Sequence, residues 1–211
     1  MALSPDRIVT EALDLLAETG VDGLGMRPLA ARLDVRPSAL YFHVRDKQQL
    51  LDAMAARIHA ASLADLELPA PGVTWDDWLA ERARTLRRAL LAHRDGARVF
   101  AGSDVRDAAG HRALELTLRT LTAAGFPPRA AARSYPALYH FTIGFVIEEQ
   151  TRTGPAAEID VARFPLAAAA VDDLFDPDPD VAFEAGLSVV MDGLRAQLAA
   201  HSPSRSPSVS R

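Results

Sequence analysis

The sequence predicts an all-α protein, and three observations support this prediction. Apolar residues recur at helical spacing along nearly all of the 211 residues, and alternating, strand-like runs are almost absent. Alanine and leucine, both good helix formers, are abundant throughout. Proline and glycine gather in short breaks between the periodic segments, as expected for loops that join helices.

The first helix is expected to begin after Ser4, because serine is a favourable N-cap and Pro5 suits the first helical position. Gly20 can adopt the left-handed conformation that ends a helix, and a loop is expected from residue 21 to 26. One face of this helix is apolar and consists of Ile8, Ala12, Leu15 and Leu16.

Two short helices are expected next, around residues 28–33 and 37–43, joined by a tight turn at 34–36. A longer helix then begins with Asp46 as its N-cap. Three short helices whose last two are joined by a three-residue turn predict a helix-turn-helix domain, although the same spacing also fits part of a plain helix bundle. The residues expected to pack against the first helix are Leu29, Ala30, Leu33, Leu40, Tyr41 and Val44.

The rest of the chain is also predicted to be helical. A break rich in proline covers residues 67–74, and Thr74 is expected to cap the helix that follows. The last ten residues lack the apolar content needed for packing and are expected to be disordered. Later helices are expected around 106–124, 128–152, 163–174 and 180–200.

Composition excludes several kinds of chemistry. The chain has no cysteine, so disulfides, zinc–thiolate sites and cysteine nucleophiles are absent. Lys47 is the only lysine and has no glycine-rich loop before it, which excludes a phosphate-binding loop. No apolar run reaches the roughly 18–20 residues of a membrane span. The sequence around Met1 has no secretory-signal pattern, so we expect a cytoplasmic protein.

The net charge of −5 conceals a local basic segment at residues 27–47. A groove-binding protein needs one basic face and not a basic chain, so this segment is compatible with DNA binding and equally with a solvated surface. The first residues of the helix expected at 37–43 could reach base edges in the major groove of DNA. The residues expected on the exposed face are Arg36, Ser38, Ala39, Phe42 and His43.

Residues 23–51 resemble the DNA-binding domain of the TetR family of transcriptional regulators, most specifically in the run from Leu40 to Val44 followed by Asp46 and Lys47. Asp34 stands where the family usually has glycine, but aspartate tolerates a left-handed conformation. The resemblance implies that Arg27, Arg36, Pro37, Ser38 and Ala39 contact bases and that Tyr41, His43 and Lys47 contact phosphates.

Three later segments, residues 89–102, 140–150 and 183–198, resemble the tetracycline-repressor-like subgroup of this family. The resemblance implies a C-terminal helical ligand-binding and dimerisation domain, whose last long helices form a four-helix bundle with a second subunit. We therefore expect a helix-turn-helix DNA-binding domain at 1–46, a connecting helix at 47–66, the ligand-binding and dimerisation domain at 67–200 and a tail at 201–211.

The resemblance also implies a ligand pocket, but two positions depart from the subgroup. Phe100 and Leu63 stand where two histidines engage magnesium–tetracycline, and neither side chain can bind a metal. We therefore expect a small, largely apolar effector, no metal and no cofactor, with Arg82 and Glu148 fixing any polar group. The expected lining is Leu63, Arg82, Leu86, Phe100, Leu114, Leu118, Tyr135, Tyr139, His140 and Glu148.

No catalytic motif is present: the chain lacks a Gly-x-Ser-x-Gly elbow, a His-Glu-x-x-His motif and a complete glycine-rich dinucleotide turn. A spaced pair, His140 and Glu148, could bind metal, but a hydrogen-bonded histidine is the favoured interpretation. We expect a ligand-responsive repressor that binds a palindromic operator as a homodimer and is not an enzyme. The alternative is an all-α small-molecule-binding protein or enzyme with no operator function.

Overall fold

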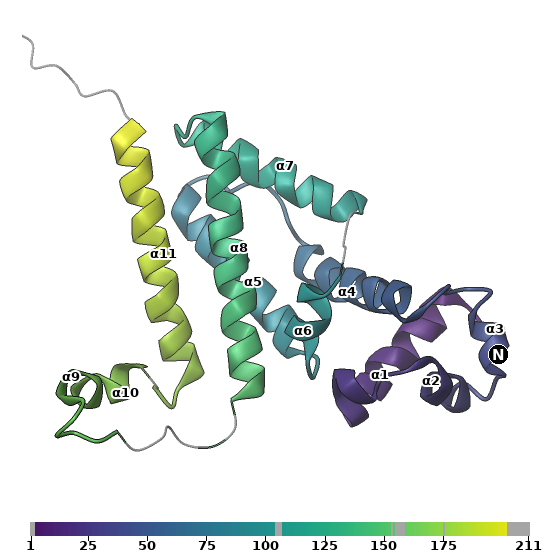
Figure 1. Cartoon of the computed structure of the whole chain (residues 1–211). Coiled ribbons are helices and arrows are strands. Elements are labelled where there is room, and N and C mark those ends of the chain that lie inside the picture. Colours follow the sequence, from purple (N-terminus) through teal and green to yellow (C-terminus); the bar gives the residue numbers. More distant parts are fainter. Residues whose placement is uncertain (1–2, 104–106, 153, 155–158, 175, 202–211) are drawn as a thin grey trace, which may run out of the picture. The chain divides into compact units, whose positions relative to one another are not determined.

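The computed structural model describes residues 3–103, 107–152, 154, 159–174 and 176–201, and within these ranges it contains helices and no strand (Figure 1). The all-α prediction is confirmed. Within the same ranges, no helix combines the length and the hydropathy that a membrane span requires. The helices are α1 Pro5–Gly23, α2 Met26–Arg32, α3 Pro37–Leu40, α4 Lys47–Leu63, α5 Trp75–Leu91, α6 Gly96–Ala101, α7 Ala108–Ala123, α8 Pro128–Thr151, α9 Pro165–Ala169, α10 Val171–Leu174 and α11 Pro179–His201.

The chain forms two compact units, and three of the helices contribute to both. The first unit holds α1 to α4, α6 and parts of α5, α7 and α8. It comprises Met1–Glu67, Arg82–Leu114 and Thr142–Thr153. The second unit holds the other parts of those three helices and α9 to α11. It comprises Leu68–Glu81, Glu115–Phe141 and Gly154–Arg211.

Helix α1 begins as predicted and ends differently. The Ser4 hydroxyl accepts a hydrogen bond from the Arg7 amide at 3.3 Å, and Pro5 occupies the first helical position. Gly20 is left-handed (φ 70°) as expected, but the chain resumes a helical turn up to Gly23 instead of entering a loop. The loop expected at 21–26 is therefore confined to residues 24–25, because a distant carboxylate holds the amide of Val21.

The turn between α2 and α3 adopts the expected left-handed conformation at Asp34, where φ is 54°. Aspartate tolerates this region better than most residues, so the departure from glycine leaves the motif intact. Helix α3 ends at Leu40, earlier than the predicted residue 43, and the chain continues in a turn. The Val44 amide still donates to the Leu40 carbonyl at 2.9 Å, so the turn keeps a helical hydrogen bond.

The core of the three-helix unit is the predicted one, with one exception. Tyr41, which we expected to pack inside, is 52% exposed and points away from this core. The other predicted contacts are made by side chains that are almost fully buried. They are Ile8, Ala12, Leu16, Leu29, Ala30, Leu33, Leu40 and Val44.

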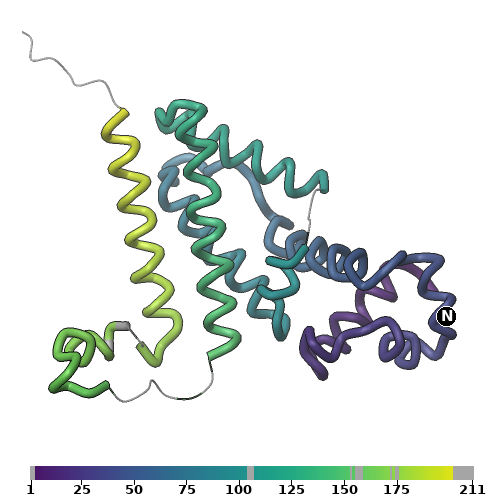
Figure 2. Tube along the Cα trace, in the orientation of Figure 1, coloured from purple at the N-terminus to yellow at the C-terminus, as the bar shows by residue number. Residues whose placement is uncertain are grey.

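Helix α4 leaves this unit with the predicted cap: the Asp46 carboxylate accepts from the Gln49 amide at 2.8 Å. Helix α6, which the sequence did not predict as a separate element, packs beside α4 (Figure 2). Its N-cap, Asp95, is left-handed with φ 54°. This conformation turns the chain sharply after α5, and it depends on contacts with distant residues.

In the second unit, the first half of α8 lies antiparallel to α11 (Figure 1). The Ser134 hydroxyl donates to the Gln197 side-chain oxygen at 3.3 Å, and the rings of Phe141 and Phe183 stack with centroids 5.5 Å apart. The single helix expected at 163–174 is divided into α9 and α10 by Ala170. The tail expected to be disordered, apart from His201, lies outside the described residues.

We predict that Leu40→Ala lowers the free energy of unfolding by about 2–5 kcal/mol, because the Leu40 side chain is fully buried and its loss leaves a cavity. Urea denaturation followed by circular dichroism measures the change. Phe42→Ala is the matched control, because this large apolar side chain is 89% exposed. Equal destabilisation by both substitutions would contradict the packing described above.

Candidate DNA-binding face and effector site

Helix α3 presents its first residues to solvent. Pro37 occupies the first helical position, and Arg36 is the extended N-cap residue before it. The side chains of Arg36, Pro37 and Ser38 are exposed, and Ala39 is half-buried. Only the opposite side of the helix, through Leu40, packs into the core. The start of α3 is therefore available to a partner.

A cluster of aromatic side chains continues this surface beyond α3. Tyr41, Phe42 and His43 are all exposed, and Phe42 reaches 89% exposure. Exposed apolar side chains that gather in a patch indicate an interaction surface, and Phe42 was absent from the contacts implied by the resemblance. The sequence did contain a signal for this role, because Phe42 is a large apolar residue that does not belong to the residues expected to pack against the first helix.

The basic residues of the segment 27–47 are not equivalent. Arg32 pairs with Glu11 at 2.9 Å and with Glu18 at 2.7 Å, so α1 neutralises it. Arg27, Arg36 and Arg45 have no ion pair within the described part of the chain, and all three are exposed. They form the unpaired basic face.

Lys47, at the start of α4, is exposed, and its ammonium donates weakly to the Val21 carbonyl at 3.4 Å. Together with Tyr41 and His43 it offers donors beside the exposed start of α3. An α-helix fits the major groove of DNA, where arginine reads guanine edges, while flanking donors bind phosphates. The arrangement is thus suited to reading a DNA duplex.

A network of hydrogen bonds joins the end of α1 to the turn before α6. The Asp95 carboxylate accepts from the Val21 amide at 2.9 Å. The Arg94 guanidinium donates to the Glu18 carbonyl at 2.9 Å, which satisfies a carbonyl that the helix end leaves free. A Cβ at Gly20 would lie only 2.9 Å from the Asp95 carboxylate, so this close approach requires glycine.

An ion pair extends the same network. The two terminal nitrogens of Arg98 each lie 3.2 Å from an oxygen of Asp22. The hydrogen bond from Arg98 is the main reason that the pKa of Asp22 lies below its ordinary value. Both side chains are solvent-accessible, so the pair orients α6 and adds little to stability.

The side chains of two glutamines bond to the backbone at the two ends of α6. The Gln150 side chain, on α8, accepts from the Ala97 amide at 3.1 Å and donates to the His93 carbonyl at 2.8 Å. The Gln48 side chain, on α4, donates to the Gly102 carbonyl at 2.9 Å. Helix α6 is therefore bonded to α1, α4 and α8 within the first unit.

The first unit also gathers several of the expected effector contacts. Leu63, Leu86 and Phe100 are all less than a tenth exposed. The Arg82 guanidinium, half-buried, donates to the Ser62 carbonyl at 2.8 Å. All four residues belong to the first unit, and we refer to the three buried apolar side chains as the effector wall.

His59 lies on this wall, and the sequence analysis missed it. Its ring centroid is 5.3 Å from that of Phe100, and its side chain is only 7% exposed. Burial lowers the pKa of His59, with Arg82 acting in the same direction and Asp107 opposing it. The available signal was a lone histidine among apolar positions of a helix, one turn before Leu63.

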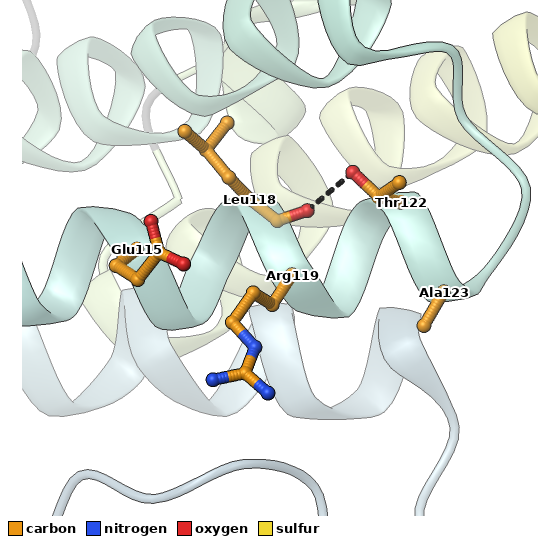
Figure 3. A pocket seen from close by; sticks show the side chains of 5 residues that line it. All are labelled: Glu115, Leu118, Arg119, Thr122 and Ala123. Atoms are coloured by element: carbon orange, nitrogen blue, oxygen red, sulfur yellow. Dashed lines mark hydrogen bonds between the residues drawn. The ribbon is translucent and has the colours of Figure 1, made fainter.

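Leu114 and Leu118, expected in the pocket, have less enclosed environments. Leu114 is 37% exposed, and Leu118 is half-buried. Figure 3 shows Leu118 beside a surface hollow of about 400 Å³ on α7, where its carbonyl accepts from the Thr122 hydroxyl at 2.7 Å. The hollow is open to solvent and is lined by Glu115, Leu118, Arg119, Thr122 and Ala123.

Three further candidates form an aromatic series on α8 in the second unit. The rings of Tyr135 and Tyr139 stack with centroids 5.6 Å apart, and the His140 ring meets Tyr139 edge-on at 5.9 Å. Burial is the main reason that the pKa of Tyr139 is raised. His140 and Glu148 are exposed. Within the described residues, no cluster of three or more histidine or carboxylate side chains is placed to hold a metal ion.

An exposed recognition helix on a three-helix unit, followed by a larger helical region, defines a DNA-binding transcriptional regulator. The family model for bacterial regulatory proteins of the tetR family matches residues 8–54, and that for the tetracyclin repressor-like C-terminal domain matches residues 68–198. The chain belongs to the TetR family. It is a ligand-responsive transcriptional repressor that binds operator DNA as a dimer.

Individual relatives agree with this assignment. The chain is 42% identical over 197 residues to the tetracycline repressor protein class A from transposon 1721 of Escherichia coli, covering 91% of this chain and 90% of the relative. A possible TetR family regulator from Streptomyces coelicolor A3(2) is 38% identical, with a TM-score of 0.82, and 92% and 99% of the two chains are covered. ActR of Streptomyces coelicolor in complex with actinorhodin is 30% identical, with a TM-score of 0.80, and 94% and 99% are covered.

We predict that Lys47→Ala and Arg36→Ala weaken operator binding in different ways. A lost phosphate contact lowers the slope of log Kd against log salt by about one per subunit and acts on all sequences alike. A lost base contact costs about 1–3 kcal/mol and relaxes specificity at one position of each half-site. Fluorescence anisotropy at several salt concentrations separates the two effects.

Arg119→Ala, which removes an exposed charge on α7, is the control for this comparison and is expected to leave both quantities unchanged. The assignment of the DNA-binding face would be contradicted if folded Lys47→Ala and Arg36→Ala both kept wild-type affinity for the operator. It would also be contradicted if the control lost as much affinity as they did.

We predict that His59 makes the protein less stable in mild acid. Because burial depresses its pKa in the folded state, the unfolded chain binds a proton first as the pH falls below about 6.5. The free energy of unfolding therefore decreases from pH 7 to pH 5, and His59→Leu reduces that slope. Urea denaturation at several pH values measures it; an identical pH dependence in the variant would refute the burial effect.

Proposed function

We propose that this repressor reads a palindromic operator through Arg27, Arg36, Pro37, Ser38 and Ala39, and binds phosphate through Tyr41, His43 and Lys47. The exposure of the first turn of α3 carries this proposal. Two copies of that turn, spaced about 34–36 Å apart in a dimer, meet successive major grooves on one side of the DNA. The DNA-reading region comprises residues 1–46, and α4 connects it to the effector region at 67–200.

The dimer interface that we propose is formed by α8 and α11. Helix α11 buries one stripe inside its own unit, yet it exposes Val189 by 73% and Val181 by 53%. Exposed apolar side chains on a long helix favour a four-helix bundle with a second copy. The buried stripe comprises Phe183, Leu187, Met191 and Leu194.

The effector that we propose is a small, largely apolar molecule that binds without magnesium. Leu63, Leu86 and Phe100 form a buried apolar wall, and neither a leucine nor a phenylalanine can bind a metal. The structure of a relative with the same fold, ActR of Streptomyces coelicolor, contains actinorhodin, which supports an effector other than tetracycline. The expected effector thus differs from magnesium–tetracycline.

The route by which effector binding releases DNA runs through α6. Phe100 places α6 against the effector wall, while Arg94 and Asp95 hold the end of α1 in the DNA-reading region. A shift of α6 therefore changes how α1 and α4 support the recognition helices. Weakening operator binding 100-fold requires a coupling free energy of about 2.7 kcal/mol, which is within the usual allosteric range.

The protein acts in this proposal by binding alone, in the cytoplasm, and catalyses no reaction. The sequence motifs of hydrolases, metalloproteases and dinucleotide enzymes are missing from the chain. Its output is a change in operator occupancy.

The test begins with operator fragments selected from a random DNA pool by the purified dimer. We expect 1,8-dihydroxyanthraquinone, a three-ring and largely apolar probe, to release these fragments in a gel shift with EDTA present. We expect tetracycline with magnesium to release them much less effectively. Selection of no DNA would overturn the function, and release by magnesium–tetracycline alone would overturn the effector class.

We predict that Arg94→Ala weakens the response to the effector, because the variant loses the bond between the α6 turn and the end of α1. The ratio of operator Kd values with and without the anthraquinone probe is expected to fall from about 100 to below about 10. Arg88→Ala, an exposed position on α5, serves as the control. An unchanged ratio in a folded Arg94 variant would refute this coupling route.

A further inference from the structure

His59 carries a buried polar atom whose hydrogen-bonding capacity is unused. The Nδ1 nitrogen is inaccessible to solvent and has no hydrogen-bond partner within the described residues. Buried polar groups of proteins are almost always paired, so an exception calls for an explanation. A partner that is absent from the free chain, such as a ligand, is one explanation.

The neighbours of His59 do not supply that partner. The Asp107 carboxylate accepts instead from the Gly110 amide at 2.7 Å, and the Arg82 guanidinium donates to the Ser62 carbonyl. These are the two charged groups that act on the His59 pKa. The backbone of Gly110 covers one edge of the ring, since a Cβ there would lie 3.6 Å from its Cε1.

The remaining surroundings are aromatic and apolar. The Phe100 ring is tilted by 52° against the imidazole at 5.3 Å, and Leu63 follows one helical turn later on α4. A buried water needs two to four polar partners, and the side chains of Phe100 and Leu63 offer it none. A flat aromatic molecule with one well-placed polar group suits such a site better.

We propose that His59 anchors the effector through Nδ1 and that the effector class is an aromatic ring system bearing a hydroxyl group. This inference rests on the proposed function, since it concerns the same effector wall. A neutral imidazole nitrogen pairs with a hydroxyl in either tautomer, because the hydroxyl both donates and accepts. The low pKa of His59 keeps the ring neutral at pH 7.

Two probes test the proposal: 1,8-dihydroxyanthraquinone and the parent anthraquinone, which lacks the hydroxyl groups. Equilibrium binding to the full-length dimer is measured by quenching of tryptophan fluorescence, with EDTA present. We expect the wild-type protein to bind the hydroxylated probe at least about tenfold more tightly, because a site built around a hydroxyl rejects the analogue that lacks it.

Variants separate an anchoring role from a structural one. His59→Leu is expected to bind both probes about equally, whereas His59→Gln, which keeps a hydrogen-bonding side chain, retains part of the preference. His111→Leu, at an exposed position of α7, should behave as wild type. The 15N resonance of His59 Nδ1 should also move when the hydroxylated probe binds.

Each outcome decides the proposal. Equal binding of the two probes by the wild-type protein, binding of neither, or an undiminished preference in His59→Leu overturns it. If the wild-type protein bound both probes equally and both released operator, the proposed response to an effector would stand. The role of His59 as its anchor would then be refuted. Failure of both probes to release operator would instead count against the proposed effector class.

Discussion

The hydrogen bond between the Asp95 carboxylate and the Val21 amide is the constraint on which the rest of the first unit depends. It holds the last turn of α1 after the left-handed Gly20, and it fixes the sharp turn from which α6 begins. Arg94 strengthens the contact by satisfying the carbonyl of Glu18. The DNA-reading helices and α6 therefore form one mechanically continuous unit.

Helix α6 transmits this constraint to the effector wall because it is short and bonded on several sides. Phe100 contacts His59 on α4, while Gln48 and Gln150 hold its two ends through backbone groups. Such an element has few ways to move, so a ligand that displaces Phe100 must also disturb the turn at Asp95. An allosteric switch requires an element that can adopt two packed arrangements, and α6 is the element of the first unit suited to this role.

The sequence predicted the features that are decided locally. Ser4 and Asp46 cap their helices through bonds to amides three residues away, and Asp34 adopts the left-handed conformation of the turn before α3. The features that the sequence analysis missed depend on residues far apart in the chain. The helical turn after Gly20 needs a carboxylate 74 residues away, and the unused nitrogen of His59 becomes visible only when its neighbours are placed.

Hydrogen exchange at the Val21 amide tests the central claim most directly. It is measured in the dimer, free and with 1,8-dihydroxyanthraquinone at a concentration that releases operator. The account predicts at least about tenfold faster exchange at Val21 with the probe, while the Leu29 amide, bonded to the Gly25 carbonyl at 3.1 Å, stays unchanged. Operator release with unaltered exchange at Val21 would contradict the account.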